Sequence, residues 1–144
     1  MVWKAGLKDL AAVTQLACSL WPSHSEDEMQ AEIAELLGKK DAAFFLAYVQ
    51  DRPVGFSQCQ LRHDYVEGTS ASPVGYLEGI YVAKDWRKHG IARELLSAAE
   101  DWAKEQGCRE FASDCELTNM QSLKFHVSVG FEEANRIICF TKKI

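Results

Sequence analysis

The strongest constraint on the fold is a strand, a glycine turn and an amphipathic helix that follow one another in the middle of the chain. Residues 74–83 are apolar and aromatic, which predicts a central strand. Gly79 interrupts it, and a glycine there indicates a bulge or a close backbone approach. Gly90 then opens a helix with one apolar face, and Gly107 closes it. This order predicts an α/β fold.

Hydrophobic periodicity predicts the other elements. Helices are expected over 7–20, 25–38 and 118–128, and strands near the N-terminus and over 44–50, 54–62, 109–114 and 137–141. Capping boxes are expected at Ser25 with Glu28 and at Thr118 with Gln121. Residues 51–53 predict a hairpin turn, and 131–134 are compatible with one more strand. The polar segment 63–73 is interpreted as a surface loop beside the site, within a single domain over residues 1–144.

Charge and cysteine usage narrow the class of protein. The net charge of -5, from 21 acids against 16 bases, lacks the footprint of a nucleic-acid binder and suits a cationic small molecule. The five cysteines are scattered and never spaced as a metal or redox pair, which favours a reducing cytoplasm. No apolar run resembles a signal core or a membrane span, so we expect a soluble, unexported protein without a membrane partner.

The turn from Arg87 to Ala92 carries the clearest sign of a ligand. A helix N-terminus presents free backbone N–H groups and partial positive charge, which together suit a pyrophosphate. Gly90 would let the backbone approach the anion, with Lys88 and Arg93 beside it. The spacing matches neither a Walker sequence nor a dinucleotide fingerprint. On spacing alone, an ordinary strand-to-helix turn with solvated bases fits equally well.

The same turn resembles the acetyl-CoA pyrophosphate loop, Arg-x-x-Gly-x-Ala, of the GNAT superfamily of N-acetyltransferases. Asn119, Ser122, Phe125, Gly130 and Phe131 resemble a second segment of that family, and the likeness extends over residues 4–142. The resemblance implies a mixed, mostly antiparallel sheet with two splayed neighbouring strands, flanked by about four helices. It also implies acetyl-CoA as co-substrate, no metal, and a homodimer.

One position departs from the family pattern. The usual tyrosine, which can protonate the departing thiolate, is His126 in this chain. Histidine titrates near neutral pH and could donate the same proton, and its spacing from Asn119 and Ser122 places all three on one helix face. A histidine that only packs against or hydrogen-bonds the cofactor is equally compatible with the pattern.

Two carboxylates are the candidate catalytic groups. Alternation along the strand predicts Tyr76, Glu78, Ile80 and Val82 on one face, and in the GNAT fold the thioester lies in the gap beside this strand. Glu78 and Asp114 would then attract the ammonium group of an acceptor and take its proton. We expect direct attack by the amine, with Cys115 a buried structural thiol rather than an acyl carrier.

Several segments resemble the bacterial aminoglycoside 6′-N-acetyltransferases within that superfamily, among them 20–24, 62–68, 77–80 and 112–114. The resemblance implies these drug-contacting residues: Trp21, His24, Tyr65, Glu78, Asp114 and, where relatives can place an acid, Asn135. It implies these coenzyme contacts: Ile80, Tyr81, Val82, Arg87, Lys88, His89, Gly90, Ile91, Ala92, Asn119 and His126. Alternative acceptors are a polyamine, a small metabolic amine or a peptide N-terminus. A non-catalytic acyl-CoA-binding module is the alternative of another class.

Overall fold

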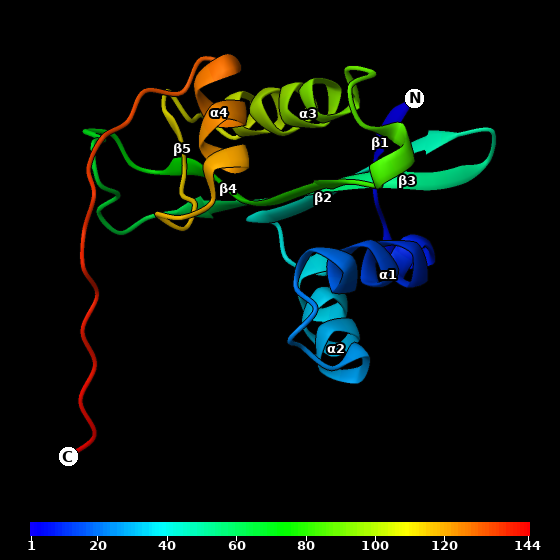
Figure 1. Ribbon diagram of the computed structural model, residues 1–144, viewed down its shortest axis with the longest axis horizontal. Helices are drawn as coiled ribbons and strands as arrows, with labels where there is room; N and C mark the ends of the chain where they lie inside the picture. Colours follow the sequence, from blue (N-terminus) through cyan, green and yellow to red (C-terminus); the bar gives the residue numbers. More distant parts are fainter.

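The computed structural model describes residues 1–144 and places one five-stranded sheet between two helical layers (Figure 1). The strands are β1 (Val2–Lys4), β2 (Ala42–Val49), β3 (Arg52–Arg62), β4 (Val74–Val82) and β5 (Phe111–Ser113). The helices are η1 (Leu7–Asp9), α1 (Leu10–Leu20), α2 (Glu26–Leu37), η2 (Lys84–Trp86), α3 (Ile91–Glu105) and α4 (Met120–Ser128). None of these helices has the length and apolar character that crossing a bilayer requires.

The sheet is mixed, as the sequence predicts. Its strands follow the order β1-β2-β3-β4-β5, and all neighbours are antiparallel except β4 and β5. The parallel pair is short, because residues 75–77 of β4 pair with 111–113 of β5 while β4 continues to Val82. β5 ends at Ser113, so β4 beyond Leu77 has no paired strand on that side, and we call this gap the fork between β4 and β5.

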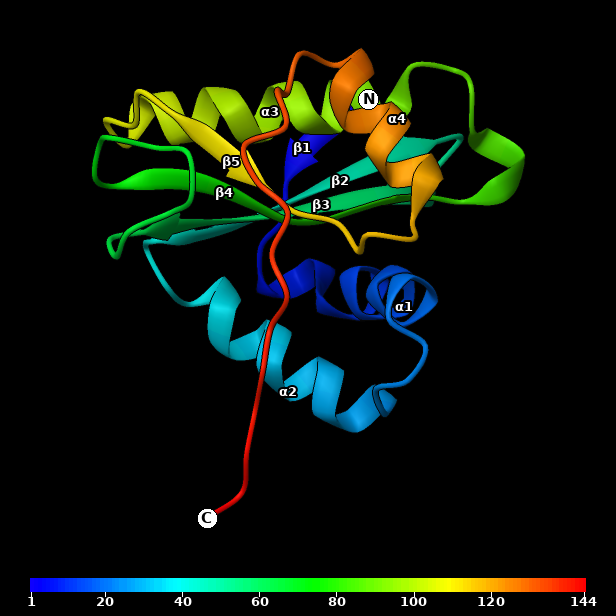
Figure 2. The same ribbon diagram turned by 60° about the vertical axis from the view of Figure 1, so that its left-hand side comes forward.

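Packing on both faces explains why β2 is a continuous apolar run. Phe44 and Leu46 contribute to one core with α1 and α2, whereas Phe45 and Ala47 contribute to the other core with α3. Figure 2 shows α1 and α2 on one side of the sheet and α3 on the other. A strand covered on both faces has no solvent-facing positions for polar residues.

Turn and cap chemistry differ in detail from the predictions. The β2–β3 hairpin turns at Gln50 and Asp51, with φ of 49° and 62°, one residue earlier than predicted, and Pro53 belongs to β3. Ser25 caps α2, its hydroxyl accepting from the Glu28 amide, but the reciprocal bond of the expected capping box, from the Ser25 amide to the Glu28 side chain, does not form. The cap predicted at Thr118 is wrong, because the side chain of Asn119 caps α4 by accepting from the Ser122 amide at 3.1 Å.

The predictions of strands over 137–141 and 131–134 are wrong. After α4 the chain has no helix or strand, and the last residues extend away from the sheet (Figures 1 and 2). Ile137, Ile138 and Phe140 are 71%, 80% and 90% exposed. Their β propensity is high, but a strand forms only where its backbone groups find a partner strand.

Candidate functional site

A bulge in β4 sets the direction of the first candidate side chain. Gln58 of β3 pairs with Gly79 and Cys59 pairs with Leu77, so Glu78 has no partner across the ladder. A bulge of this kind bends the strand and re-aims a side chain. The glycine in this strand marks both a bulge and a close approach, because Gly79 lies against the ring of Trp21.

The bulge also corrects the predicted alternation. Tyr76 and Glu78 lie on the α1 and α2 side of the sheet, as the alternation predicts. Tyr76 contacts Arg62 there, and Glu78 lines a cleft between the sheet and α2. Ile80 and Val82 instead pack with the α3 core, and Tyr81 packs with the opposite core. Simple alternation fails here because the extra residue shifts the side-chain period by one.

Glu78 is half-buried and paired. Its carboxylate accepts three hydrogen bonds from Arg62: Nε at 3.1 Å and Nη2 at 2.9 Å to Oε1, and Nη2 at 2.8 Å to Oε2. Burial raises the pKa of Glu78 above its ordinary value of 4.5, and Arg62 partly opposes that rise. Glu78 is thus a carboxylate whose proton affinity is tuned upward, as suits a base.

Asp114 lies just past β5 and is tied to β4. The hydroxyl of Tyr76 donates to Asp114 Oδ2. Burial, with this hydrogen bond and the charge of Asp114, raises the pKa of the Tyr76 phenol, so the phenol stays a donor. The charge of Asp114 also raises the pKa of Glu78, which places the two predicted acids within electrostatic reach of each other.

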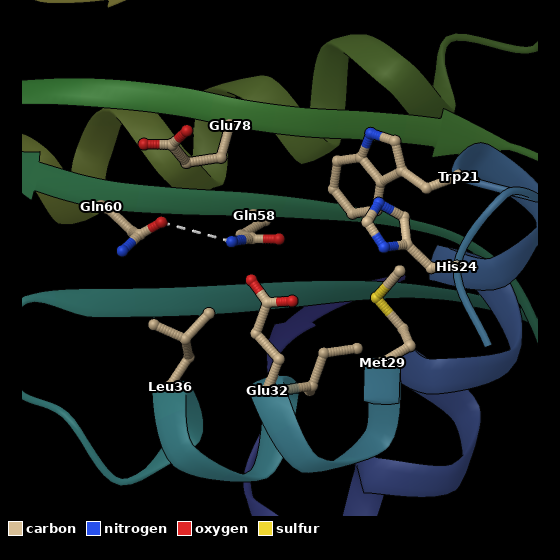
Figure 3. A pocket seen from close by; sticks show the side chains of 9 residues that line it. Trp21, His24, Met29, Glu32, Leu36, Gln58, Gln60 and Glu78 are labelled. Carbon is tan, nitrogen blue, oxygen red and sulfur yellow. Dashed lines mark hydrogen bonds between the residues drawn. The ribbon is translucent and has the colours of Figure 1, made fainter. Parts of the chain in front are cut away.

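The cleft beside Glu78 lies between the sheet and α2 (Figure 3). Its lining residues are Trp21, His24, Met29, Glu32, Ile33, Leu36, Gln58, Gln60 and Glu78. Figure 3 shows Glu32 on α2 and Glu78 on β4 extending from opposite walls, with Gln58 donating to Gln60 between them at 3.3 Å. The structure therefore places Trp21, His24 and Glu78, three of the predicted site residues, around one cleft.

Sequence reasoning missed Glu32, Gln58 and Gln60. Gln58 and Gln60 are polar residues at alternate positions of a largely buried strand, which is a signal for a polar cleft. Glu32 belongs to an acidic helix and carries no signal of its own, because only the packing of α2 turns it toward the sheet.

Tyr65 and Asn135 lie away from this cleft. Tyr65 is 76% exposed on the loop over 63–73. Asn135 Nδ2 donates to Glu67 Oε1 on the same loop at 2.9 Å. Ser70 and Ala71 amides on that loop donate to Glu110 Oε1, at 2.9 and 2.7 Å, which fixes it beside β5.

The glycine turn before α3 has the geometry expected of an anion site. Gly90 is the N-cap of α3 with φ of +82°, it provides no side-chain cap, and a Cβ there would meet nothing within 4 Å. The amides of the first turn have no partner within a helix, so they remain available to a ligand. Arg87 Nε donates to the Val82 carbonyl at 2.8 Å, and His89 Nδ1 lies 2.7 Å from the Arg87 carbonyl, which braces the turn.

His126 joins α4 to the fork between β4 and β5. Its Nδ1 lies 2.7 Å from the Ser122 carbonyl and its Nε2 lies 2.8 Å from Ser113 Oγ. Because a carbonyl only accepts, Nδ1 carries a proton, and Nε2 accepts from Ser113 in neutral histidine or donates to it in the cation. In the second case the Ser113 hydroxyl can donate to the Leu77 carbonyl at 3.2 Å. Sequence analysis missed Ser113, which is the last β5 residue paired before the fork.

The cysteines and acids form no further centre. No group of three or more His, Cys, Asp or Glu residues could hold a metal ion. The prediction of a buried Cys115 is wrong, because Cys115 is exposed after the short β5 ends at Ser113. Cys59 and Cys108 are the buried thiols, and burial raises the pKa of both, that of Cys59 to about 12, so they stay protonated.

Comparison with known proteins gives consistent results. Residues 10–131 match the acetyltransferase (GNAT) family. The chain is 44% identical over 133 residues to the aminoglycoside N(6′)-acetyltransferase type 1 of Stenotrophomonas maltophilia, which is 92% of this chain and 86% of that protein. The enzyme of the same name from Serratia marcescens is 39% identical over 137 residues, or 94% of each chain.

Solved structures agree with these relatives. The structure of AAC(6′)-Iy with the bisubstrate analogue CoA-S-monomethyl-acetylneamine has a TM-score of 0.96 and 37% identity, over 100% of this chain and 98% of that one. The apo structure of AAC(6′)-IG from Acinetobacter haemolyticus has a TM-score of 0.95 and 40% identity, over 100% and 99% of the two chains.

Proposed function

This chain belongs to the GNAT acetyltransferase family, and we propose that it transfers the acetyl group of acetyl-CoA to the 6′-amine of aminoglycoside antibiotics, which confers resistance. The relatives named above carry that activity in their names, and one neighbour holds a bisubstrate analogue of coenzyme A and an aminoglycoside. The single observation that carries the proposal is the cleft, because the half-buried Glu78 carboxylate lines one wall and Glu32 lines the opposite wall. We propose that residues 1–144 act as one catalytic domain.

The drug would lie in this cleft as a polycation between acidic walls. Glu78 and Glu32 would each hold an amine from opposite sides, and the amides of Gln58 and Gln60 offer donors and acceptors to sugar hydroxyls. Trp21 offers a flat apolar surface for a sugar ring, with His24 beside it.

The outer contacts belong to the loop and the neighbouring strand. Tyr65 and Asn135 would meet the far end of the drug from the rim, because both belong to or contact the exposed loop over 63–73. Asp114, held by Tyr76, would add a negative charge near Glu78.

Coenzyme binding is assigned to the fork and the glycine turn. Acetyl-CoA, when bound, supplies the activated acetyl group. The uncapped amides of Ile91 and Ala92, together with Lys88 and His89, would hold its pyrophosphate where Gly90 leaves room. Backbone groups of β4 beyond Leu77 have no β5 partner, so the segment from Ile80 to Val82 would bind the pantetheine arm and the acetyl oxygen.

The protons move through three side chains of this protein. Glu78 takes the proton of the acceptor ammonium, directly or through water, so that the free amine attacks the acetyl carbon. As the new C–N bond forms and the C–S bond breaks, the nitrogen gives up its second proton to water, and the leaving sulfur takes a proton. His126 would supply it from Nε2 through the Ser113 hydroxyl, because Ser113 lies between His126 and the fork. Asn119 caps the helix that carries His126.

The assembly is proposed to be a cytoplasmic homodimer. Ile137, Ile138 and Phe140 project from the body with most of their apolar surface exposed, which a second copy could cover. Light scattering after size exclusion should give twice the chain mass, and deleting residues 137–144 should give the monomer. A full-length monomer, or a deletion variant that still dimerises, would contradict this arrangement.

A thiol-release assay tests the function. Coenzyme A should be released from acetyl-CoA with kanamycin or tobramycin, which carry a 6′-amine, and not with analogues that carry a 6′-hydroxyl. Equal turnover of the two drug classes would exclude the 6′-amine as acceptor, and faster turnover of peptides or polyamines would favour those acceptors.

A further inference from the structure

We propose that Arg62 is a positioning residue that occupies the acceptor-amine position at Glu78 in the free protein and leaves when the ammonium group of the drug arrives. The proposal deepens the function above and rests on it. Arg62 would then compete with the substrate and also hold the base ionised before the substrate binds.

Arg62 makes the contacts with Glu78 that a cationic acceptor amine would make. Its guanidinium donates to both oxygens of Glu78, at 2.8 to 3.1 Å, which fills the carboxylate that an incoming amine would use. The guanidinium also packs over an aromatic ring, because Arg62 Cζ lies 3.4 Å from the ring centroid of Tyr76. A cation–π contact of this kind orients the guanidinium but is weak enough to be broken when the side chain moves.

Arg62 is more exposed than Glu78, as it must be if the arginine leaves and the drug ammonium takes its place. The side chain of Arg62 is 43% exposed, while that of Glu78 is 20% exposed and lines the cleft. Arg62 ends β3, so its long side chain can move into solvent while Glu78 stays on the central strand. Replacing one cation by another keeps the half-buried carboxylate paired throughout, which avoids the cost of an unpaired buried charge.

The groups around Glu78 make Arg62 the main counter-charge. Tyr76 and Cys59 are neutral neighbours on β4 and β3, and Asp114 adds a like charge from the end of β5. Across the cleft lie Glu32, another acid, and His24. Burial raises the pKa of Glu78, and Arg62 is the group that lowers it again. Removing Arg62 therefore leaves the carboxyl more easily protonated.

Three readouts on Arg62→Gln test the proposal. At neutral pH tobramycin should bind about fivefold more tightly, as a lower Kd measured by calorimetry without acetyl-CoA. The reason is that the partly exposed Arg62 side chain no longer competes with the drug for Glu78. The ¹³C resonance of the Glu78 carboxyl should titrate at higher pH than in the wild type. The acid limb of kcat/KM should move up by about one pH unit.

Two further variants keep these results interpretable. Arg62→Lys retains the charge without the two-point contact, so it should lie between the wild type and Arg62→Gln in all three readouts. Arg52→Gln, at the other, exposed end of β3, should match the wild type. Tobramycin binding that is unchanged or weaker in Arg62→Gln, or an unmoved Glu78 titration, would overturn the proposal.

Acetylation by the wild type distinguishes a failure of the proposed function from a failure of the role proposed for Arg62. Failure of the wild type to acetylate tobramycin would overturn the proposed function. Normal acetylation by the wild type, with Arg62→Gln indistinguishable from it in binding and pH dependence, would overturn only the role of Arg62.

Discussion

Gly79 of β4 lies in direct contact with the indole of Trp21, and this contact shapes one end of the cleft. A Cβ at residue 79 would lie 2.6 Å from both Cη2 and Cζ2 of that ring and 3.1 Å from Leu20 Cδ2. Real Cβ atoms do not approach so closely, so only glycine permits this packing. The bulge at Glu78 and the position of Trp21 are thus parts of one local arrangement.

Gly79→Ala should therefore displace Trp21 and weaken drug binding. Overpacking of this kind costs about 1 to 3 kcal/mol of stability, and the movement of the ring should raise KM for the drug more than it lowers kcat. Thermal unfolding and steady-state kinetics measure the two effects. Gly6→Ala is the matched control, because a Cβ at residue 6 meets nothing within 4 Å. Equal behaviour of the two variants would contradict the contact.

Glu78→Gln should lower kcat by at least about tenfold, because general-base catalysis contributes roughly two to four orders of magnitude. In the wild type the acid limb of kcat/KM should lie above pH 4.5, since burial raises the pKa of this carboxyl above that ordinary value. Glu105→Gln at the exposed end of α3 is the control and should leave the profile unchanged. Near-normal turnover in Glu78→Gln would assign Glu78 a structural role.

The sequence predicted the strands β2, β3 and β4 and the helix opened by Gly90, because these depend on local patterns, whereas the mixed sheet was implied by the family resemblance. The apolar runs, glycines and capping residues act within a few positions of one another, so periodicity exposes them. Trp21, His24 and Glu78 were found through the family resemblance, and the cleft brings these three together.

The errors come from interactions between distant segments. The bulge at Glu78 shifts Ile80 and Val82 to the other face, and it appears only in the pairing of β3 with β4. The predicted strand over 137–141 has the right residue types but no partner strand along this chain. Glu32 and Ser113 act through neighbours on other elements, which no spacing in the sequence reveals.

Glu32→Gln should raise KM for a polycationic drug by about three- to tenfold and leave kcat nearly unchanged, because Glu32 faces the cleft from the wall opposite Glu78. Steady-state kinetics with tobramycin measure the split. Glu35→Gln, which loses only an exposed pair with Lys39 on the same helix, is the control. A fall in kcat without a change in KM would place Glu32 outside the binding surface.

Gly90→Ala should weaken acetyl-CoA binding at least about tenfold, because φ of +82° strains any residue with a Cβ and the turn would relax away from the coenzyme. Calorimetry with coenzyme A measures the loss. Gly107→Ala has a comparable φ of +90° with nothing within 4 Å of the new Cβ, so it should carry the same strain without the binding defect. Equal losses in the two variants would remove the turn from the site.

The most direct test of the account is identification of the product formed from kanamycin and ¹³C-acetyl-CoA by mass spectrometry and two-dimensional NMR. The account predicts a single added acetyl group, with its carbonyl carbon coupled to the proton of the 6′-amide nitrogen, and loss of this product in Glu78→Gln. Acetylation at another amine, or an unmodified drug with intact acetyl-CoA, would contradict it.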